Sequence, residues 1–386
     1  MRTIGWVALL IVIGCVVAAL PVLAQSNPPC GGRSATAYVN WPQFQADPCL
    51  TGYNANELIL NSATVGNLVL NWMYPTGGEV YSSPAVVNTV LYVGSSDSNL
   101  YALSANTGAL LWKYATGALV ESSPAVANGV VYFGSADGNL YALNANSGTL
   151  LWNYTTGSYV DTAPTVANGV VYFGSADGNL YALNAATGAL LWKYTTGGGV
   201  ESPAVVNGVV YVASDALYAL NASTGALLWK DTGLLIESSP AVANGVVYLA
   251  TLQALYAFDA GTGALLWKNS ADLEVVSAPA VAHSMVYMGC TNGKLYAFDA
   301  GTGMLVWNYT TGDVIQAPPS VANDVVYIIS NGNNLTALNA RTGAFLWKYK
   351  MGDIYGGNIS SPAVANGVVY AGSLDHKVYS FHLPGH

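Results

Sequence analysis

Acidic side chains recur at one place in a repeated sequence pattern, shortly before a proline that follows serine or alanine. The candidate positions are Glu121, Asp161, Glu201 and Glu237, with the amide Gln316 further along the chain. Carboxylates gathered at one site can bind a cation such as Ca²⁺ or attract a basic segment of a partner. A solvated loop is the simpler explanation, since a net-negative protein must place its acids somewhere. The sequence therefore favours an ordinary solvated loop here and offers these residues as candidates for binding a ligand or cation.

Other reactive patterns are missing from the sequence. It contains no Gly-x-Ser-x-Gly elbow, no His-Glu-x-x-His pair and no phosphate-binding glycine loop. The four histidines, His283, His376, His382 and His386, lack the spacing of metal ligands. We therefore predict no catalytic residue and no metal site of these kinds.

Composition limits the class of partner. The formal charge is −9 with only 11 Lys and Arg, so the chain offers no basic patch to displace counterions from phosphates. A nucleic-acid partner is disfavoured. The chain is 52% hydrophobic and has 26 Tyr and 42 Gly, a composition typical of β-rich proteins.

The first residues read as a targeting segment. Arg2 precedes an apolar run over 4–23, and small residues at 22–24 would suit cleavage before Gln25. We expect residues 1–24 to be a cleaved signal peptide, with a lipoprotein signal at Cys15 or a retained signal-anchor as alternatives. Each alternative predicts export, to the periplasm or outside the cell.

Two cysteines flank part of the N-terminal arm, which spans residues 25–67. Cys30 and Cys49 enclose a stretch with several Pro and Gly, and an oxidising compartment favours a disulfide between them. The other cysteine after the signal, Cys290, fits a small buried hydrophobe.

Tryptophans set the organisation of the chain. Eight of them are separated by 40, 40, 40, 37, 38, 40 and 40 residues. They are Trp72, Trp112, Trp152, Trp192, Trp229, Trp267, Trp307 and Trp347. Each repeat divides into four short strands separated by Asn-Gly, Asp-Gly or Thr-Gly turns, which tolerate the positive φ of tight hairpins.

The repeats predict a closed ring. Runs such as Val130 to Phe133 are apolar at every position, so the sheet they form must be covered on both faces. The first repeat has only its last strand, over 68–74, and the stretch 360–382 has only three strands. Joined, they complete one blade. The prediction is an all-β, eight-bladed propeller of four-stranded antiparallel blades over residues 68–382, with a tail at 383–386.

The pattern Ala-Leu-Asn-Ala-Ala-Thr-Gly-x-x-x-Trp at 182–192, repeated with changes at 257–267 and 297–307, resembles the pyrroloquinoline-quinone (PQQ)-like propeller repeat family. In that family this is a tryptophan-docking motif, which implies that the eight tryptophans are structural. The resemblance covers the chain from residue 41 onward, including Trp41-Pro42-Gln43-Phe44.

The resemblance implies either a quinoprotein dehydrogenase or a binding scaffold. Quinoprotein alcohol dehydrogenases carry a Cys-Cys pair above the quinone and a Trp below it, but this sequence has no Cys-Cys and only Trp41 to spare after the signal. We therefore expect a non-catalytic binding or scaffold module with no cofactor. Its partner would be an envelope or extracellular protein or a small ligand at the propeller face, and we expect a monomer. The alternative is a small PQQ- and Ca²⁺-dependent dehydrogenase that oxidises a sugar or alcohol.

Overall fold

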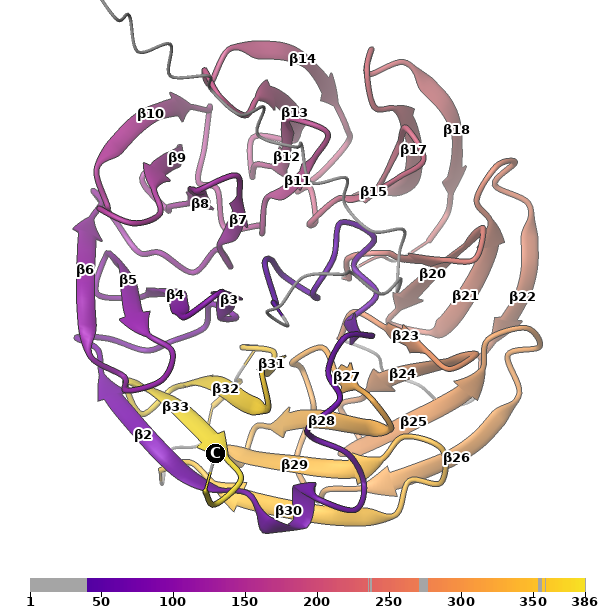
Figure 1. Cartoon of the computed structure of the whole chain (residues 1–386). Helices are drawn as coiled ribbons and strands as arrows, with labels where there is room; N and C mark the ends of the chain where they lie inside the picture. The colour runs from indigo at the N-terminus through magenta and orange to yellow at the C-terminus, as the bar shows by residue number, and fades with distance from the viewer. Residues whose placement is uncertain are drawn as a thin grey trace, which may run out of the picture.

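The computed structural model describes residues 40–234, 236, 238–270, 277–352, 356–357 and 359–385. These residues form eight sheets arranged as blades around a central axis (Figure 1). Each blade has four antiparallel strands, which we name A to D from the axis outward. Blade 7 gains a fifth, β1 (Tyr53–Asn54), which pairs in parallel with its innermost strand. The predicted eight-bladed propeller is confirmed.

Blades 1 to 4 follow one another along the chain. Blade 1 comprises β3 (Ala85–Val87), β4 (Val90–Ser95), β5 (Asn99–Ser104) and β6 (Leu110–Ala115). Blade 2 comprises β7 (Ala125–Ala127), β8 (Val130–Gly134), β9 (Asn139–Asn144) and β10 (Leu150–Thr155). Blade 3 comprises β11 (Thr165–Ala167), β12 (Val170–Gly174), β13 (Asn179–Asn184) and β14 (Leu190–Thr195). Blade 4 comprises β15 (Ala204–Val206), β16 (Val209–Ala213), β17 (Ala216–Asn221) and β18 (Leu227–Thr232).

Blades 5 to 8 complete the ring. Blade 5 comprises β19 (Ala241–Ala243), β20 (Val246–Thr251), β21 (Ala254–Asp259) and β22 (Leu265–Asn269). Blade 6 comprises β23 (Ala280–Ala282), β24 (Met285–Gly289), β25 (Lys294–Asp299) and β26 (Leu305–Thr310). Blade 7 comprises β27 (Ser320–Ala322), β28 (Val325–Ser330), β29 (Asn334–Asn339) and β30 (Phe345–Lys350). Blade 8 comprises β31 (Ala363–Ala365), β32 (Val368–Ser373), β33 (Lys377–His382) and β2 (Val69–Pro75).

Blade 8 joins the two ends of the propeller, as the incomplete terminal repeats predict. Strand β2 pairs antiparallel with β33, with Tyr74 opposite Val378. The N-terminal strand therefore supplies the outer edge of a sheet whose other strands are C-terminal. Because of this pairing, no incomplete blade with an unpaired strand edge remains where the two ends of the propeller meet.

The eight repeat tryptophans dock on the neighbouring blade, and Trp112 shows the two contacts that most of them make. The indole N–H of Trp112 donates to the Ala145 carbonyl of blade 2 at 3.0 Å. Its ring covers Gly148, where an added Cβ would lie 2.6 Å from the Trp112 Cδ2 atom. Gly148 also has a φ of +69°, so glycine satisfies both the turn and the close approach. The same indole bond recurs at the seam, from Trp347 to the Leu68 carbonyl.

Residues 41–54 of the N-terminal arm lie in the middle of the ring, where the indigo segment appears in Figure 1. Its carbonyl oxygens accept hydrogen bonds from the central residue of strand A in six of the blades, over distances of 2.6 to 2.9 Å. The pairs are Trp41 with Val86, Pro42 with Val126, Pro48 with Val205, Cys49 with Val242, Thr51 with Val281 and Gly52 with Val321. In blade 3 the Gln43 side chain accepts from Val166, and in blade 8 Asn54 donates to the Val364 carbonyl.

This arrangement has a physical cause. An innermost strand pairs on one side only, so its free N–H and C=O groups would face the channel without partners. The arm accepts from the free N–H groups of seven inner strands and donates to the carbonyls of Val86 and Val364, so its backbone occupies the channel. The channel is thus closed from within by residues 41–54.

One short 3₁₀ helix, η1 (Val65–Asn67), follows the arm. In the part of the chain that the structure describes, no helix has the length and apolar character needed to cross a bilayer.

Candidate functional site

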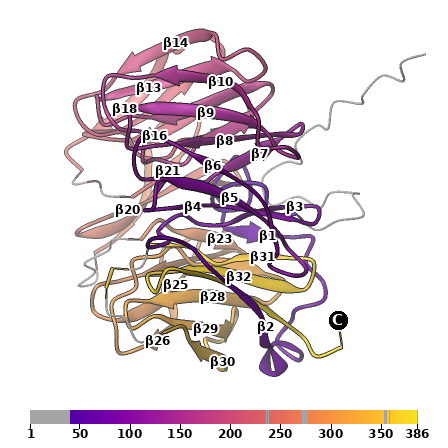
Figure 2. The ribbon, with the colours of Figure 1, turned by 90° about the vertical axis from the view of Figure 1, so that its left-hand side faces the viewer.

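The two faces of the propeller differ in which turns they carry. On one, which we call the D–A face, the loops that lead into strand A meet the B–C turns, because the Ala136 N–H donates to the Leu119 carbonyl. The opposite face, which we call the A–B face, carries the A–B and C–D turns, joined by bonds such as that from Ala105 to Thr89. In the side view the C-terminus lies at the same end of the disc as β1 (Figure 2).

A repeated clamp holds the D–A face together. In blade 2, Asp137 accepts from the Gly117 N–H at 2.8 Å and from the Tyr141 hydroxyl at 2.7 Å. Burial alone would raise the pKa of Asp137, but these hydrogen bonds outweigh it and lower the pKa. Asp97 and Asp177 bond the equivalent glycine and tyrosine in blades 1 and 3. These turn aspartates therefore fix the loops around the mouth of the channel.

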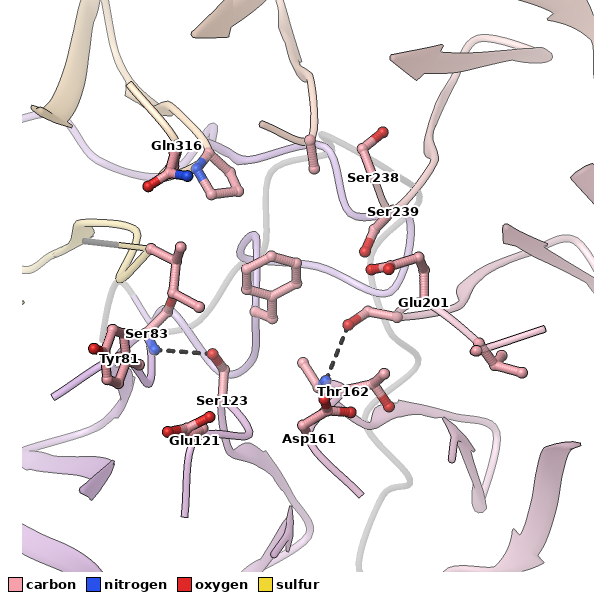
Figure 3. Close-up of a pocket in the computed structure, with 18 of the residues that line it drawn as sticks. Tyr81, Ser83, Glu121, Ser123, Asp161, Thr162, Glu201, Ser238, Ser239 and Gln316 are labelled. Atoms are coloured by element: carbon pink, nitrogen blue, oxygen red, sulfur yellow. Dashed lines mark hydrogen bonds between the residues drawn. The ribbon is translucent and has the colours of Figure 1, made fainter. Parts of the chain in front are cut away.

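A cavity of about 360 Å³ opens at the centre of the D–A face. Its walls come from the loops that precede strand A in different blades, and Phe44 of the arm also lines it. Figure 3 shows the side chains of Glu121, Asp161 and Glu201 around this opening. The channel-mouth pocket, as we name it, is thus a blind recess, because the arm occupies the channel behind it.

The predicted acidic residues lie mainly together. Glu121, Asp161 and Glu201 line the pocket on the side of blades 2 to 4, and Gln316 lines it from blade 7. Gln316 accepts a hydrogen bond from Asn331 at 3.1 Å. Glu237 lies outside the described residues, so its predicted place at the mouth stays a prediction.

Two of these carboxyl groups are poorly stabilised as anions. Burial raises the pKa of Glu121, and the neighbouring negative charge of Asp161 raises it further. Ser96 donates only a long bond of 3.5 Å to the Glu121 carboxylate. The Asp161 carboxyl group remains in contact with water at the mouth, but partial burial raises its pKa as well. Hydrogen bonds from the backbone N–H groups of residues 161 and 162 lower this pKa by less than burial raises it. The pocket therefore concentrates negative charge that lacks full compensation.

Serines beneath the carboxylates link neighbouring blades. The Ser83 N–H donates to the Ser123 hydroxyl oxygen at 2.8 Å, and the Ala163 N–H donates to that of Ser202 at 2.9 Å (Figure 3). The Ser361 N–H donates to Ser83 in the same way across the seam. These bonds tie adjacent blades together at the rim of the pocket.

Among the described residues that line the pocket there is no lysine, arginine, histidine, tryptophan or cysteine. Within the described ranges, no three acidic, histidine or cysteine side chains are grouped closely enough to hold a metal ion. The site can therefore offer carboxylates, hydroxyls and the rings of Tyr81, Tyr159 and Phe44. Such a surface attracts positive charge and accepts hydrogen bonds.

Sequence reasoning missed the contribution of the arm and of Tyr159. Tyr159 precedes the acidic position in blade 3 and is 50% exposed at the mouth. Other blades have Glu79, Leu119 and Gly199 at this position, so no repeated pattern marks it. The need for a segment such as the arm could have been predicted, because the backbone N–H and C=O groups at the inner edges of eight strands need hydrogen-bond partners.

The cysteines are partly described. Cys49 is buried and disulfide-bonded, whereas Cys30 lies outside the described residues, so their pairing stays a prediction. Cys290 is a free thiol, fully buried, and burial raises its pKa to about 12.

Comparison with known proteins places the chain in a family. A family model described as "Outer membrane protein assembly factor BamB" matches residues 60–197, 159–234 and 215–384. The chain belongs to this PQQ-like propeller family. A search of curated protein sequences gives no significant match.

Solved structures share the propeller at low sequence identity. BamB from Moraxella catarrhalis superposes with a TM-score of 0.71 at 20% identity, covering 83% of this chain and 98% of that one. The quinohemoprotein alcohol dehydrogenase from Comamonas testosteroni gives 0.78 at 17% identity, covering 90% and 81%. The computationally designed Ika8 protein gives 0.72 at 19% identity, covering 80% and 98%. At such identities these likenesses establish the fold, which scaffolds, enzymes and a designed protein share.

Proposed function

We propose that this chain is an exported, non-catalytic binding module that receives a positively charged group of a protein partner in the channel-mouth pocket. The observation that carries the proposal is a blind pocket lined by Glu121, Asp161 and Glu201, with no lysine or arginine among its described lining residues. A lysine or arginine side chain would supply the missing charge and find hydroxyl and aromatic walls. Membership of a family described by an outer-membrane assembly factor supports the scaffold class.

The quinone cofactor of related dehydrogenases fits this pocket poorly. The cofactor carries carboxylates, which the three carboxylates of the pocket would repel unless a cation lay between them. The described lining residues include no cation, and no three acidic side chains among the described residues are grouped closely enough to hold a metal ion there. The eight repeat tryptophans stand at blade junctions, and Trp41 is 1% exposed within the arm. None of them lines the pocket, so its described lining residues do not provide the tryptophan ring on which a quinone would stack. These observations support a binding module over a dehydrogenase.

The proposal can be tested with trilysine as a model for a basic segment. Calorimetric titration into the wild-type chain should give one-to-one binding that weakens as salt is added. Replacing both Glu121→Gln and Asp161→Asn should weaken binding by tenfold or more, on the order of 2 kcal/mol for two partly buried charge pairs.

A matched control removes one negative charge, as each single pocket variant, Glu121→Gln or Asp161→Asn, does. Asp231→Asn removes an acid from outer strand β18, away from the pocket, and should leave trilysine affinity unchanged. Equal weakening by the control and by single pocket variants would mean that only overall charge matters, and the proposal would then be wrong.

A further inference from the structure

The outer strands expose apolar pairs at the margin of the A–B face. A bulge before each tryptophan lets two consecutive side chains point outward, as at Leu110 and Leu111, which are 43% and 51% exposed. The same pair recurs in most blades, so the pair alone is a property of the repeat. A bulged outer edge also resists pairing with another strand.

Blades 6 and 7 depart from this repeat. Met304, Leu305 and Val306 are 69%, 46% and 51% exposed, and Phe345 is 54% exposed. The equivalent of Met304 is alanine or threonine in blades 1 to 5, and that of Phe345 is leucine. Two exposed cations, Arg341 and Lys348, lie in the same stretch of blade 7. We call these six residues the rim patch.

The rim patch is continuous across the blade junction. Trp307 follows Val306 directly, and its indole N–H donates to the Ala340 carbonyl at 3.1 Å. The Trp307 ring also covers Gly343, two residues before Phe345. The start of β26 therefore lies beside the C–D turn of blade 7, which brings its apolar side chains next to Arg341 and Phe345.

The rim patch lies at the A–B face, away from the acidic pocket. The Ala340 N–H donates to the Asp324 carbonyl in the A–B turn of blade 7. Asn40, the first described residue, also lies at this face, because its side chain accepts from Asn88 in the A–B turn of blade 1. The 39 preceding residues of the sequence, with their apolar run at 4–23, continue from there.

We propose that the rim patch docks on an anionic lipid surface. Exposed Phe, Leu and Met beside Arg and Lys are the side chains that bind the boundary between headgroups and acyl chains. The patch projects from a convex rim, and a fluid bilayer needs no matching shape. A second copy related by a two-fold axis through these cations would bring Arg341 and Lys348 against their own counterparts, which like charges disfavour.

The test uses the whole exported chain with an environment-sensitive fluorophore on single cysteines. Leu305→Cys and Phe345→Cys place the probe in the rim patch, and Leu119→Cys, 40% exposed on the D–A face, is the matched control. The unaltered chain corrects for labelling of its own cysteines, and buried Cys290 should not react. Vesicles contain phosphatidylcholine with or without phosphatidylglycerol, together with a nitroxide lipid.

Docking predicts a blue shift and nitroxide quenching at positions 305 and 345 on phosphatidylglycerol vesicles, with neither at 119. Because the readout is local, a retained N-terminal segment that merely tethers the propeller would not produce it. In separate variants, Arg341→Gln and Lys348→Gln should each weaken binding about fivefold. The double variant Met304→Ser with Phe345→Ser should weaken it at least tenfold.

Four results would overturn the proposal. Probes at 305 and 345 could stay unshifted, which would leave a protein as the occupant. All three probes could respond alike, or neutral vesicles could bind equally well. A shift could also appear without vesicles as the protein concentration rises, which would indicate a second copy. Trilysine binding at the pocket tests the other face and is independent of each result.

Discussion

Replacing Gly148 by alanine should cost far more stability than replacing Gly129, although both glycines have positive φ. An L residue at φ +69° carries a strain of about 1–2 kcal/mol. At Gly148 the new Cβ would also lie 2.6 Å from the Trp112 ring, so the indole must move. Displacing a packed ring costs about 1–3 kcal/mol, and losing its bond to Ala145 costs about 1 kcal/mol more. Gly148→Ala should therefore cost about 3–6 kcal/mol in total.

Gly129 provides the matched control, because its φ is +76° and an added Cβ would meet nothing within 4 Å. Gly129→Ala should cost only the backbone strain, about 1–2 kcal/mol. Urea denaturation followed by tryptophan fluorescence would compare both variants with the wild type, with hydrogen exchange locating the loss at the junction of blades 1 and 2. Equal costs for the two variants would refute the claim that tryptophan docking holds adjacent blades together.

Three further predictions follow from the site and the arm. Asp137→Ala should lower the free energy of unfolding by about 1–3 kcal/mol at neutral pH, because Gly117 and Tyr141 lose their acceptor. The pKa of Asp137 is lowered in the folded chain, so the wild type should keep this extra stability above about pH 4 and lose it as the pH falls further. Glu121→Gln and Asp161→Asn each remove a carboxyl group whose pKa is raised in the folded chain, so each should increase the midpoint of thermal unfolding at pH 7. The increase should disappear below about pH 4, which scanning calorimetry at both pH values would show. Trp41→Ala empties a site that is 1% exposed and should lower stability by about 3–5 kcal/mol, with faster amide exchange at Val86 in β3.

Much of the fold could be predicted because the repeat shows its own period. Trp112 and its equivalents mark where each blade ends, and glycine turns mark the hairpins within it. The incomplete repeats at the two ends predict the seam, which β2 and β33 form. These local signals recur in each repeat, so the strands and turns assigned in one repeat can be assigned at the equivalent positions of the others.

The floor of the pocket could not be predicted in this way. The arm occurs once, and its contacts with the inner strands use backbone carbonyls, which leave no pattern in the side chains. The acidic positions were found because they repeat, but their common location depends on ring closure. Glu201 illustrates the limit, since blade 4 lacks one residue between Val200 and Pro203 relative to Val120 and Pro124 in blade 2.

The most direct test of a cation-binding pocket is to titrate the wild-type chain with trilysine and, separately, with PQQ in the presence of Ca²⁺. Both titrations use the same calorimeter and buffer. The account predicts salt-sensitive, one-to-one binding of trilysine and no binding of the anionic quinone, because the described lining residues include no cation and are not grouped closely enough to hold Ca²⁺ beside it. Stoichiometric binding of PQQ, lost in Glu121→Gln, together with no binding of trilysine, would contradict it.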